Sequence, residues 1–255
     1  MYTYLHDLLS DKKGSEIFVL FGAWHFFYIA LTLITVSTVL FILKNKGNET
    51  KHKVRRAFIC IAFGLYIADF FMMPLAHGFI NIEKLPFHAC TTMCVLCFLS
   101  EFVPFLKKWR LSFVLLGFVS NLVYTIYPAG VMWFEIHPLS YRVIQTLLFH
   151  STMAVYGCLT LILERDQINI KTWWRDLAVV VGLTVWALLG NYAYNGDSEG
   201  YSHFFNWFFV VRDPFNMFPE TIAPFIMPLL NITLFFGAEM LIHSILYSAK
   251  RIRNE

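Results

Sequence analysis

Long apolar segments alternate with short polar connections along almost the whole chain. Seven segments are long enough to cross a bilayer, and they lie at about 17–43, 57–80, 87–106, 111–128, 141–163, 177–195 and 221–248. A hydrocarbon core about 30 Å thick is crossed by about 20 helical residues. Because no water reaches the backbone there, each segment must pair its own N–H and C=O groups, as a helix does. The pattern predicts an all-α, polytopic membrane protein with seven transmembrane helices.

The composition supports this interpretation. Hydrophobic residues make up 58% of the 255 residues and charged residues 15%, and the mean hydropathy is +0.58. A soluble domain normally carries about 25% charged residues. We see no internal repeat and no connection large enough to hold a second domain. We therefore expect one seven-helix domain over residues 1–255.

The distribution of basic residues predicts the orientation. Fifteen of the 20 lysines and arginines lie in the 44–56 connection, at 107–110, in the 164–176 connection and in the C-terminal segment. The other five lie on the opposite side of the predicted bundle. Cytoplasmic connections are rich in Lys and Arg, so the first set is expected to face the cytoplasm. The N-terminus is then outside and the C-terminus inside. The net charge of +3 reflects this bias, and we expect no nucleic-acid partner.

Polar side chains at membrane depth are candidates for function, because they are costly to bury in a bilayer. The charged or titratable ones are His25 in the first span, Asp69 in the second, His88 and Cys90 at the start of the third, and His150 in the fifth. Two amides, Asn121 and Asn191, lie in the fourth and sixth spans. At 1.5 Å of rise per residue, all seven lie in the outer half of the predicted bundle. We expect them to form one polar pocket. The alternative for His25, Asp69 and His150 is a structural role, in which each side chain hydrogen-bonds to a neighbouring helix.

The third span has the most informative local pattern. Cys90, Cys94, Cys97 and Glu101 recur at i, i+4, i+7 and i+11, so they share one helix face. Cys94 and Cys97 are typical of small packing residues between helices. Cys90 lies in the first turn, where unpaired N–H groups favour a thiolate. A histidine on another helix would be needed to activate it, and His150 is the candidate.

Three short motifs resemble one known family. LPFHAC at the third span, GAWHFF with His25, and FHSTMAVYG with His150 are similar to motifs of the YwaF-like bacterial integral membrane proteins. The eukaryotic branch of that family is transmembrane protein 164, an acyltransferase of ether phospholipids. Its proposed nucleophile is a cysteine on the third helix, followed about sixty residues later by a histidine. The matching residues here are Cys90 and His150. Thr91 and Thr92 follow the cysteine, where many bacterial members have an acidic residue.

The resemblance implies a Cys–His acyltransferase, or a lipase if water is the acceptor. Cys90 and His150 would be catalytic, with His25, Asp69, His88, Asn121 and Asn191 supporting them or binding substrate. The expected partners are a membrane phospholipid or lysophospholipid and the bilayer, with no cofactor and no metal. The protein is expected to be a multi-pass integral membrane protein, in the plasma membrane if it is bacterial. The aromatic-rich 195–220 connection is expected to cap the outer face, where an amphiphile would enter.

Two alternatives stay open at this level. A transporter or ligand-sensing protein would use the same polar pocket without covalent chemistry, with Asp69 and Asn231 in a proton or ion path. Pro224 and Pro228 would then break the last span, as in transporters with discontinuous helices. A zinc hydrolase needs histidine and acidic ligands that converge on one metal. Glu239 and His243 are instead expected to pair locally near the inner end of the last span.

Overall fold

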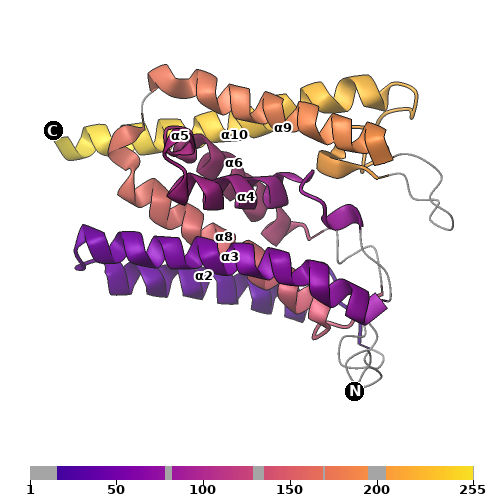
Figure 1. Cartoon of the computed structure of the whole chain (residues 1–255), viewed down its shortest axis with the longest axis horizontal. Helices are drawn as coiled ribbons and strands as arrows, with labels where there is room; N and C mark the ends of the chain where they lie inside the picture. Colours follow the sequence, from indigo (N-terminus) through magenta and orange to yellow (C-terminus); the bar gives the residue numbers. More distant parts are fainter. Residues whose placement is uncertain (1–15, 78–81, 129–134, 169, 195–204, 255) are drawn as a thin grey trace. The chain divides into compact units, whose positions relative to one another are not determined.

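The computed structural model describes residues 16–77, 82–128, 135–168, 170–194 and 205–254 (Figure 1). Residues 78–80 of the second predicted span and residue 195 of the sixth lie outside these ranges. The chain divides into two compact units. The first unit comprises residues 1–82 and 120–163, and the second comprises residues 83–119 and 164–255. Each unit is described by itself below, and the expected single domain stays a prediction.

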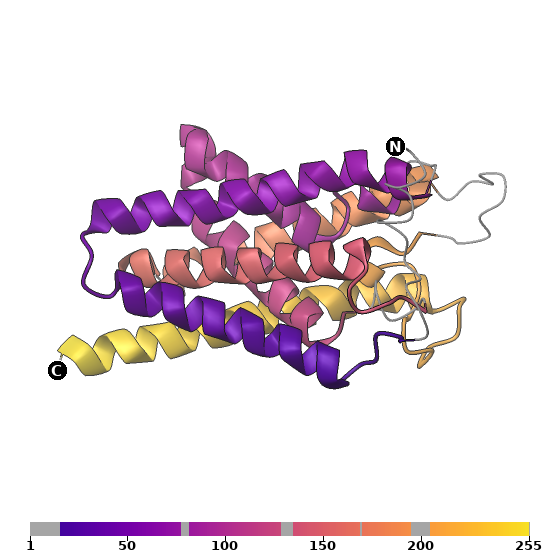
Figure 2. The ribbon, with the colours of Figure 1, turned by 90° about the horizontal axis from the view of Figure 1, so that it is seen from below.

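The first unit is a set of helices packed side by side. It contains α2 (Ala23–Leu43), α3 (Asn48–His77), the second half of α6 (Arg110–Ile126) and α8 (Tyr141–Leu163). A short turn at residues 44–47 reverses the chain, so α2 and α3 run antiparallel, and α8 lies between them and packs on both (Figures 1 and 2). The predicted fifth span agrees with α8 at both ends. The first span differs, because residues 17–22 are not helical and α2 begins after Gly22.

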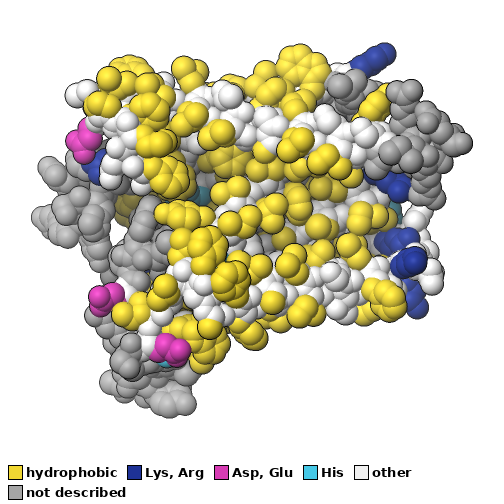
Figure 3. Space-filling model, turned by 180° about the vertical axis from the view of Figure 1, so that it is seen from behind, with side chains coloured by type: hydrophobic (Ala, Val, Ile, Leu, Met, Phe, Trp, Pro, Cys, Tyr) yellow, Lys and Arg dark blue, Asp and Glu magenta, His cyan; other side chains and the backbone are white. Residues whose placement is uncertain are grey.

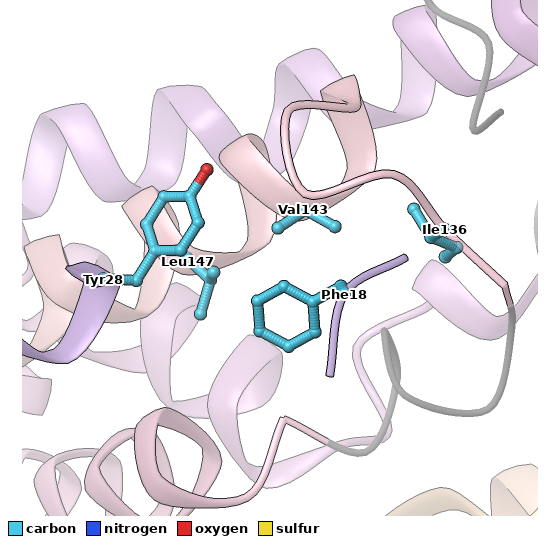
Figure 4. Close-up of a cluster of buried hydrophobic side chains, with 5 residues drawn as sticks. All are labelled: Phe18, Tyr28, Ile136, Val143 and Leu147. Atoms are coloured by element: carbon cyan, nitrogen blue, oxygen red, sulfur yellow. The ribbon is translucent and has the colours of Figure 1, made fainter. Parts of the chain in front are cut away.

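Hydrophobic clusters hold α8 in place within this unit. Phe18, Tyr28, Ile136, Val143 and Leu147 form one cluster, so the segment before α2 and the segment before α8 both close against the two helices (Figure 4). The same two segments are joined by a backbone hydrogen bond of 2.8 Å between the Phe18 N–H and the Ile136 carbonyl. A second cluster lies where the other end of α8 meets the α2–α3 turn. Packing at both ends fixes α8 along its length.

The second unit contains two long helices and several short ones. The α-helices are α4 (Ala89–Phe102), α5 (Pro104–Lys107), the first half of α6, α9 (Trp173–Tyr194) and α10 (Ala223–Asn254). The 3-10 turns are η1 (Ile82–Lys84), which bridges the two units in sequence, η2 (Arg165–Gln167), η3 (Ile170–Thr172) and η4 (Trp207–Phe209). Helices α9 and α10 pack together, and η4 packs on both. The aromatic turn η4 is therefore positioned by the two longest helices of the unit.

Prolines have different effects in two of the predicted spans. The predicted 87–106 span is divided into α4 and α5, because Pro104 disfavours a helical conformation at Val103. Pro104 itself occupies the first turn of α5, where its missing N–H costs little. In contrast, Pro224 and Pro228 do not end the last helix. Helix α10 runs through both of them as one element.

The exposed surface is that of a membrane protein. Many large hydrophobic side chains are exposed along the helices (Figure 3). Phe41, at 79%, and Phe225, at 76%, are among them. Within the described residues, α2, α8, α9 and Ala223–Ser248 of α10 are long and apolar enough to cross a bilayer. Helices α4 and α6 are apolar but shorter. The chain is thus a multi-pass membrane protein by helix length and composition, while seven spans and the orientation stay predictions.

Candidate functional site

His150 is enclosed within the first unit and held by one face of α6. It is 3% exposed, and its Nδ1 lies 2.6 Å from Oδ1 of Asn121. The ring of Tyr124 stacks on the imidazole, with the ring centres 3.8 Å apart and the planes at 15°. Asn121 and Tyr124 are three residues apart on a helix, so they project from the same face. The imidazole is therefore fixed along its edge by Asn121 and across its plane by Tyr124.

The partner of His150 determines which ring nitrogen carries the proton. An amide oxygen can only accept a hydrogen bond, so Nδ1 of His150 donates to Asn121. In the neutral ring the lone pair is then on Nε2, which is the atom that a general base uses. In Cys-His-Asn enzymes an asparagine orients the histidine in this way. The Asn121–His150 contact has the geometry of the asparagine and histidine in such a site.

His25 is built into the structure differently. Its Nδ1 accepts the Phe21 N–H at 3.0 Å, and its Nε2 lies 3.0 Å from the Thr125 carbonyl, to which it donates. The residue is fully buried. Phe21 has a positive φ of 55°, so this hydrogen bond also stabilises an unfavourable backbone conformation. With both nitrogens engaged, His25 joins the start of α2 to α6 and positions the turn that carries Asn121.

The buried carboxylate of the first unit lies on α3. Oδ1 of Asp69 accepts the hydroxyl of Tyr141 at 3.3 Å, and Asp69 is 2% exposed. One helical turn along α8, Gln145 donates to the Leu65 carbonyl at 3.3 Å. These two bonds cross the same α3–α8 contact. Asp69 therefore contributes to polar contacts between two helices, through the hydroxyl of a tyrosine.

Cys90 lies in the first turn of α4, in the second unit. The helix begins at Ala89 after His88 in an extended conformation, and no side chain caps it. The first helical hydrogen bond runs from the Thr92 N–H to the His88 carbonyl. The N–H groups of the first three residues have no partner of this kind. Cys90 is partly exposed, whereas Cys94 and Cys97 are buried, and none of the five cysteines forms a disulfide.

The side chains of His88 and Asn191 bind the backbone of the aromatic turn η4. Nδ1 of His88 accepts the Phe208 N–H at 3.2 Å. The Asn191 amide exchanges two hydrogen bonds with the backbone of Trp207, at 3.1 and 3.0 Å. Asn231 on α10 donates to the carbonyls of Phe208 and Phe209, at 2.8 and 3.0 Å. Both phenylalanines have positive φ angles, 56° and 51°. These contacts therefore stabilise a strained turn next to the start of α4.

The predicted site residues divide between the two units. Asn121 and His150 are in direct contact, and His25 binds the same helix one turn further along. His88 and Asn191 meet through η4. Cys90 belongs to the second unit and His150 to the first, so their pairing stays a prediction.

Three aromatic residues of the site were not anticipated from the sequence. They are Tyr124, Tyr141 and Trp207. Tyr124 had a usable signal, because it lies three residues after Asn121 and so on the same helix face. Tyr141 and Trp207 had none, since each reaches its partner across a long separation in the chain. Asn231 was considered only for an ion path, whereas it binds the η4 backbone.

A separate polar cluster lies between α9 and α10. His243 and Asp176 are 2.9 Å apart, so the expected local pair of His243 with Glu239 gives way to a pair between helices. Glu239 is fully buried, and its two carboxylate oxygens have no hydrogen-bond partner among the described residues. Among all the residues that the structure describes, no group of three or more His, Cys, Asp or Glu side chains is arranged to hold a metal ion.

Comparison with known proteins identifies a family. The model of the TMEM164 family matches residues 20–246, which is most of the chain. The match includes α2, α4, α6 and α8, and therefore the helices that carry His25, Cys90, Asn121 and His150. No curated protein and no solved structure shows significant similarity to the chain.

Proposed function

The chain belongs to the TMEM164 family, and on this premise we propose that it is a membrane acyltransferase that moves an acyl chain between phospholipids through a thioester on Cys90. The proposal goes beyond family membership. It is supported by the similarity of the motifs around Cys90 and His150 to those of the acyltransferase branch. A phospholipid is the donor, and a lysophospholipid is the acceptor. If water were the acceptor, the same reaction would be the hydrolysis that a lipase catalyses.

The proposed reaction has two halves. In the first, Nε2 of His150 takes the thiol proton, and the Cys90 sulfur attacks the carbonyl carbon of the lipid ester. A C–S bond forms, the ester C–O bond breaks, and the lysophospholipid leaves with the proton from His150. In the second, the hydroxyl of the acceptor gives its proton to His150 and attacks the thioester. The acyl chain is transferred and the Cys90 thiol is restored.

The orientation of His150 is the observation that carries this proposal. A buried imidazole with Nδ1–H donated to Asn121 and a ring stacked on Tyr124 has its basic nitrogen fixed before substrate arrives. Such pre-organisation is what general-base catalysis requires. At Cys90, the N–H groups of the first turn of α4, which have no carbonyl partner within the helix, are suited to stabilise the oxyanion of the tetrahedral intermediate. The proposal requires the two residues to meet during the reaction.

Trapping of the acyl-enzyme tests the role of Cys90. Purified protein is incubated with phosphatidylcholine, and the intact mass is measured before and after hydroxylamine, which cleaves thioesters. We expect a mass increase of one acyl chain that hydroxylamine removes. It should vanish in Cys90→Ala and persist in the control Cys60→Ala, whose thiol is exposed on α3. Equal acylation of Cys90→Ala and wild type would exclude the thioester scheme.

The asparagine gives a second test that separates positioning from folding. Asn121→Ala removes the acceptor of the His150 Nδ1–H, whereas Asn121→Asp keeps an acceptor of similar shape. We expect Asn121→Ala to slow acylation by no more than the roughly 10²–10⁴-fold that a general base contributes, because His150 is kept and only its orientation is lost. Asn121→Asp should retain most of the rate, with a changed pH profile because the carboxylate stabilises the protonated imidazole. Equal rates in Asn121→Ala and wild type would remove Asn121 from the mechanism.

A crosslink tests whether the two residues meet. In a background without the other four cysteines, His150→Cys is combined with native Cys90 and treated with a short thiol crosslinker. We expect an internal crosslink, and none with Leu148→Cys, which is exposed on α8. A crosslink at neither position would argue against a shared site.

One observation favours a second function, that of a transporter or ligand sensor. Asp69 is a carboxylate that is almost fully buried on α3 and bound by a tyrosine hydroxyl, which is typical of ion and proton paths in membrane proteins. Uptake assays in proteoliposomes distinguish the two functions. Solute uptake that survives Cys90→Ala and is lost in Asp69→Asn would support transport over acyl transfer.

A further inference from the structure

An apolar groove runs along the second unit, between α4, the start of α6 and α9. Its volume is about 460 Å³, within the range of small-molecule sites. Its walls are mostly hydrophobic side chains, among them Leu96, Phe113 and Leu183. On the α9 side of the groove, Gly182 has no side chain, and an added Cβ there would meet no heavy atom within 4 Å. The groove is thus open and apolar.

The polar groups at one end of the groove are already satisfied. The Thr92 hydroxyl donates to the Pro86 carbonyl at 2.6 Å, and the Trp186 indole N–H donates to the same oxygen at 2.7 Å. These three residues all line the groove. Both donors are already used on one carbonyl, so this end offers a polar ligand no free donor and suits an apolar occupant. In a bilayer the available apolar occupant is an acyl chain.

The other end of the groove lies at Trp109 and carries positive charge. Lys107 and Lys108 precede Trp109 and are exposed. The Arg175 guanidinium, on the first turn of α9, donates to the Lys108 carbonyl at 3.1 Å and lies 5.5 Å from the Trp174 ring. The rings of Trp109 and Trp174 meet edge to face at 5.5 Å. Tryptophans beside basic residues mark the headgroup level of a bilayer.

The acidic residues near this end do not neutralise these cations. Glu164 and Glu101 bind the buried guanidinium of Arg110. Asp176, the next residue after Arg175, is buried and paired with His243. The exposed charge at this end is therefore that of Lys107 and Lys108, beside the half-buried Arg175. An anionic headgroup matches it.

We propose that this groove binds an anionic phospholipid, with the headgroup phosphate at Lys108 and Arg175 and one acyl chain along the groove toward Trp186. Basic pockets between helices are a known mode of anionic lipid recognition. The lipid would belong to the leaflet on the Lys- and Arg-rich side. Thr92 and Val95, which line the groove on α4, lie on the opposite side of the helix from Cys90, at about 100° of rotation per residue. The site is thus independent of the proposed acyl transfer.

Native mass spectrometry of the purified protein with an equimolar mixture of phosphatidylglycerol and phosphatidylcholine tests this site. Wild type should retain phosphatidylglycerol preferentially. Gly182→Leu fills the groove and should lower the retained fraction several-fold, and Ala178→Leu, on the same wall, should act in the same direction. The matched control is Gly64→Leu on α3, where a Cβ also meets open space. Thermal unfolding midpoints show whether each variant is folded.

The charge is tested separately. Lys108→Gln with Arg175→Gln should reduce the preference for phosphatidylglycerol by about fivefold per cation, while Lys44→Gln with Lys46→Gln leaves it unchanged. Retention equal to wild type in both folded groove variants would overturn the proposal. An unchanged preference in the Lys108 and Arg175 variant would overturn the headgroup assignment.

Discussion

At the scale of single residues, the role of each membrane-embedded histidine follows from the partners of its two ring nitrogens. His25 uses both nitrogens on backbone groups, so it acts as a structural link. His88 accepts from the backbone of η4. His150 donates from Nδ1 to a side-chain amide, which leaves the basic lone pair on the other nitrogen. The sequence showed three similar histidines in apolar segments, and only their contacts distinguish them.

Gly190 on α9 gives a prediction at the same scale. A Cβ at Gly190 would lie 2.4–2.7 Å from ring atoms of Phe87. Phe87 has little room to move, because its ring packs against Trp186 and Trp207, each at 4.9 Å. We therefore expect Gly190→Ala to destabilise the protein by about 1–3 kcal/mol, measured as a lower free energy of unfolding in detergent.

The matched control is Gly237→Ala on α10, where a Cβ meets open space. This change should be neutral or slightly stabilising, because alanine favours a helix more than glycine does. If Gly190→Ala and Gly237→Ala changed the free energy of unfolding equally, the Phe87 ring would be able to move aside for the added methyl group.

At the scale of elements, α4 is defined by what lies at its two ends. It has 14 residues, about 21 Å of helix, and it is shorter than the hydrocarbon core. Its start is held by η4 through His88, and Pro104 ends it. At its far end Glu101 joins a buried ion pair in which Arg110, the first residue of α6, binds Glu164. A short helix with fixed ends keeps Cys90 at a defined position.

The Arg110 ion pair gives a prediction about these ends. Arg110→Met leaves two buried carboxylates without the guanidinium and should cost about 3–5 kcal/mol of unfolding free energy. Arg110→Lys should recover part of it, because lysine keeps the charge but lacks the planar fork. The double variant with Glu164→Met should be more stable than Arg110→Met alone.

The control is Lys53→Met, which removes an exposed pair with Glu49 and should change stability little. A loss for Arg110→Met as small as that for Lys53→Met would contradict the structural importance of the buried pair. Chemical denaturation in mixed micelles would supply both values.

At the scale of the whole molecule, the chain is a multi-pass member of the TMEM164 family with two compact units. The catalytic proposal takes its nucleophile from one unit and its base from the other. The lipid site takes all its residues from the second unit. Acyl transfer and lipid binding are therefore separable by mutation.

The predicted orientation is tested with a thiol reagent that does not cross membranes. In a background without native cysteines, Gly47→Cys lies in the α2–α3 turn and Met217→Cys on the opposite predicted side. We expect labelling of Met217→Cys in intact cells, and of Gly47→Cys only after permeabilisation, because the Lys- and Arg-rich connections face the cytoplasm. The reverse pattern would invert the topology.

The apolar segments alone determined the helical, membrane-embedded character of the protein. Burial of about 20 apolar residues in a bilayer leaves the backbone no alternative to a helix, which is why residues 141–163 were assigned correctly at both ends. The motifs around His25, Cys90 and His150 likewise indicated the family. The end of α4 is also determined locally, by Pro104. The hydropathy pattern alone did not indicate this break.

Only the tertiary structure decided which polar residues meet. Hydropathy records the depth of a side chain in the membrane but not the direction in which it points. Asn121 binds His150 across 29 residues and His25 reaches α6 across 100, and such contacts depend on how the helices are rotated about their axes. That rotation is set by packing of whole helix faces, as in the clusters along α8, and no single segment contains this information.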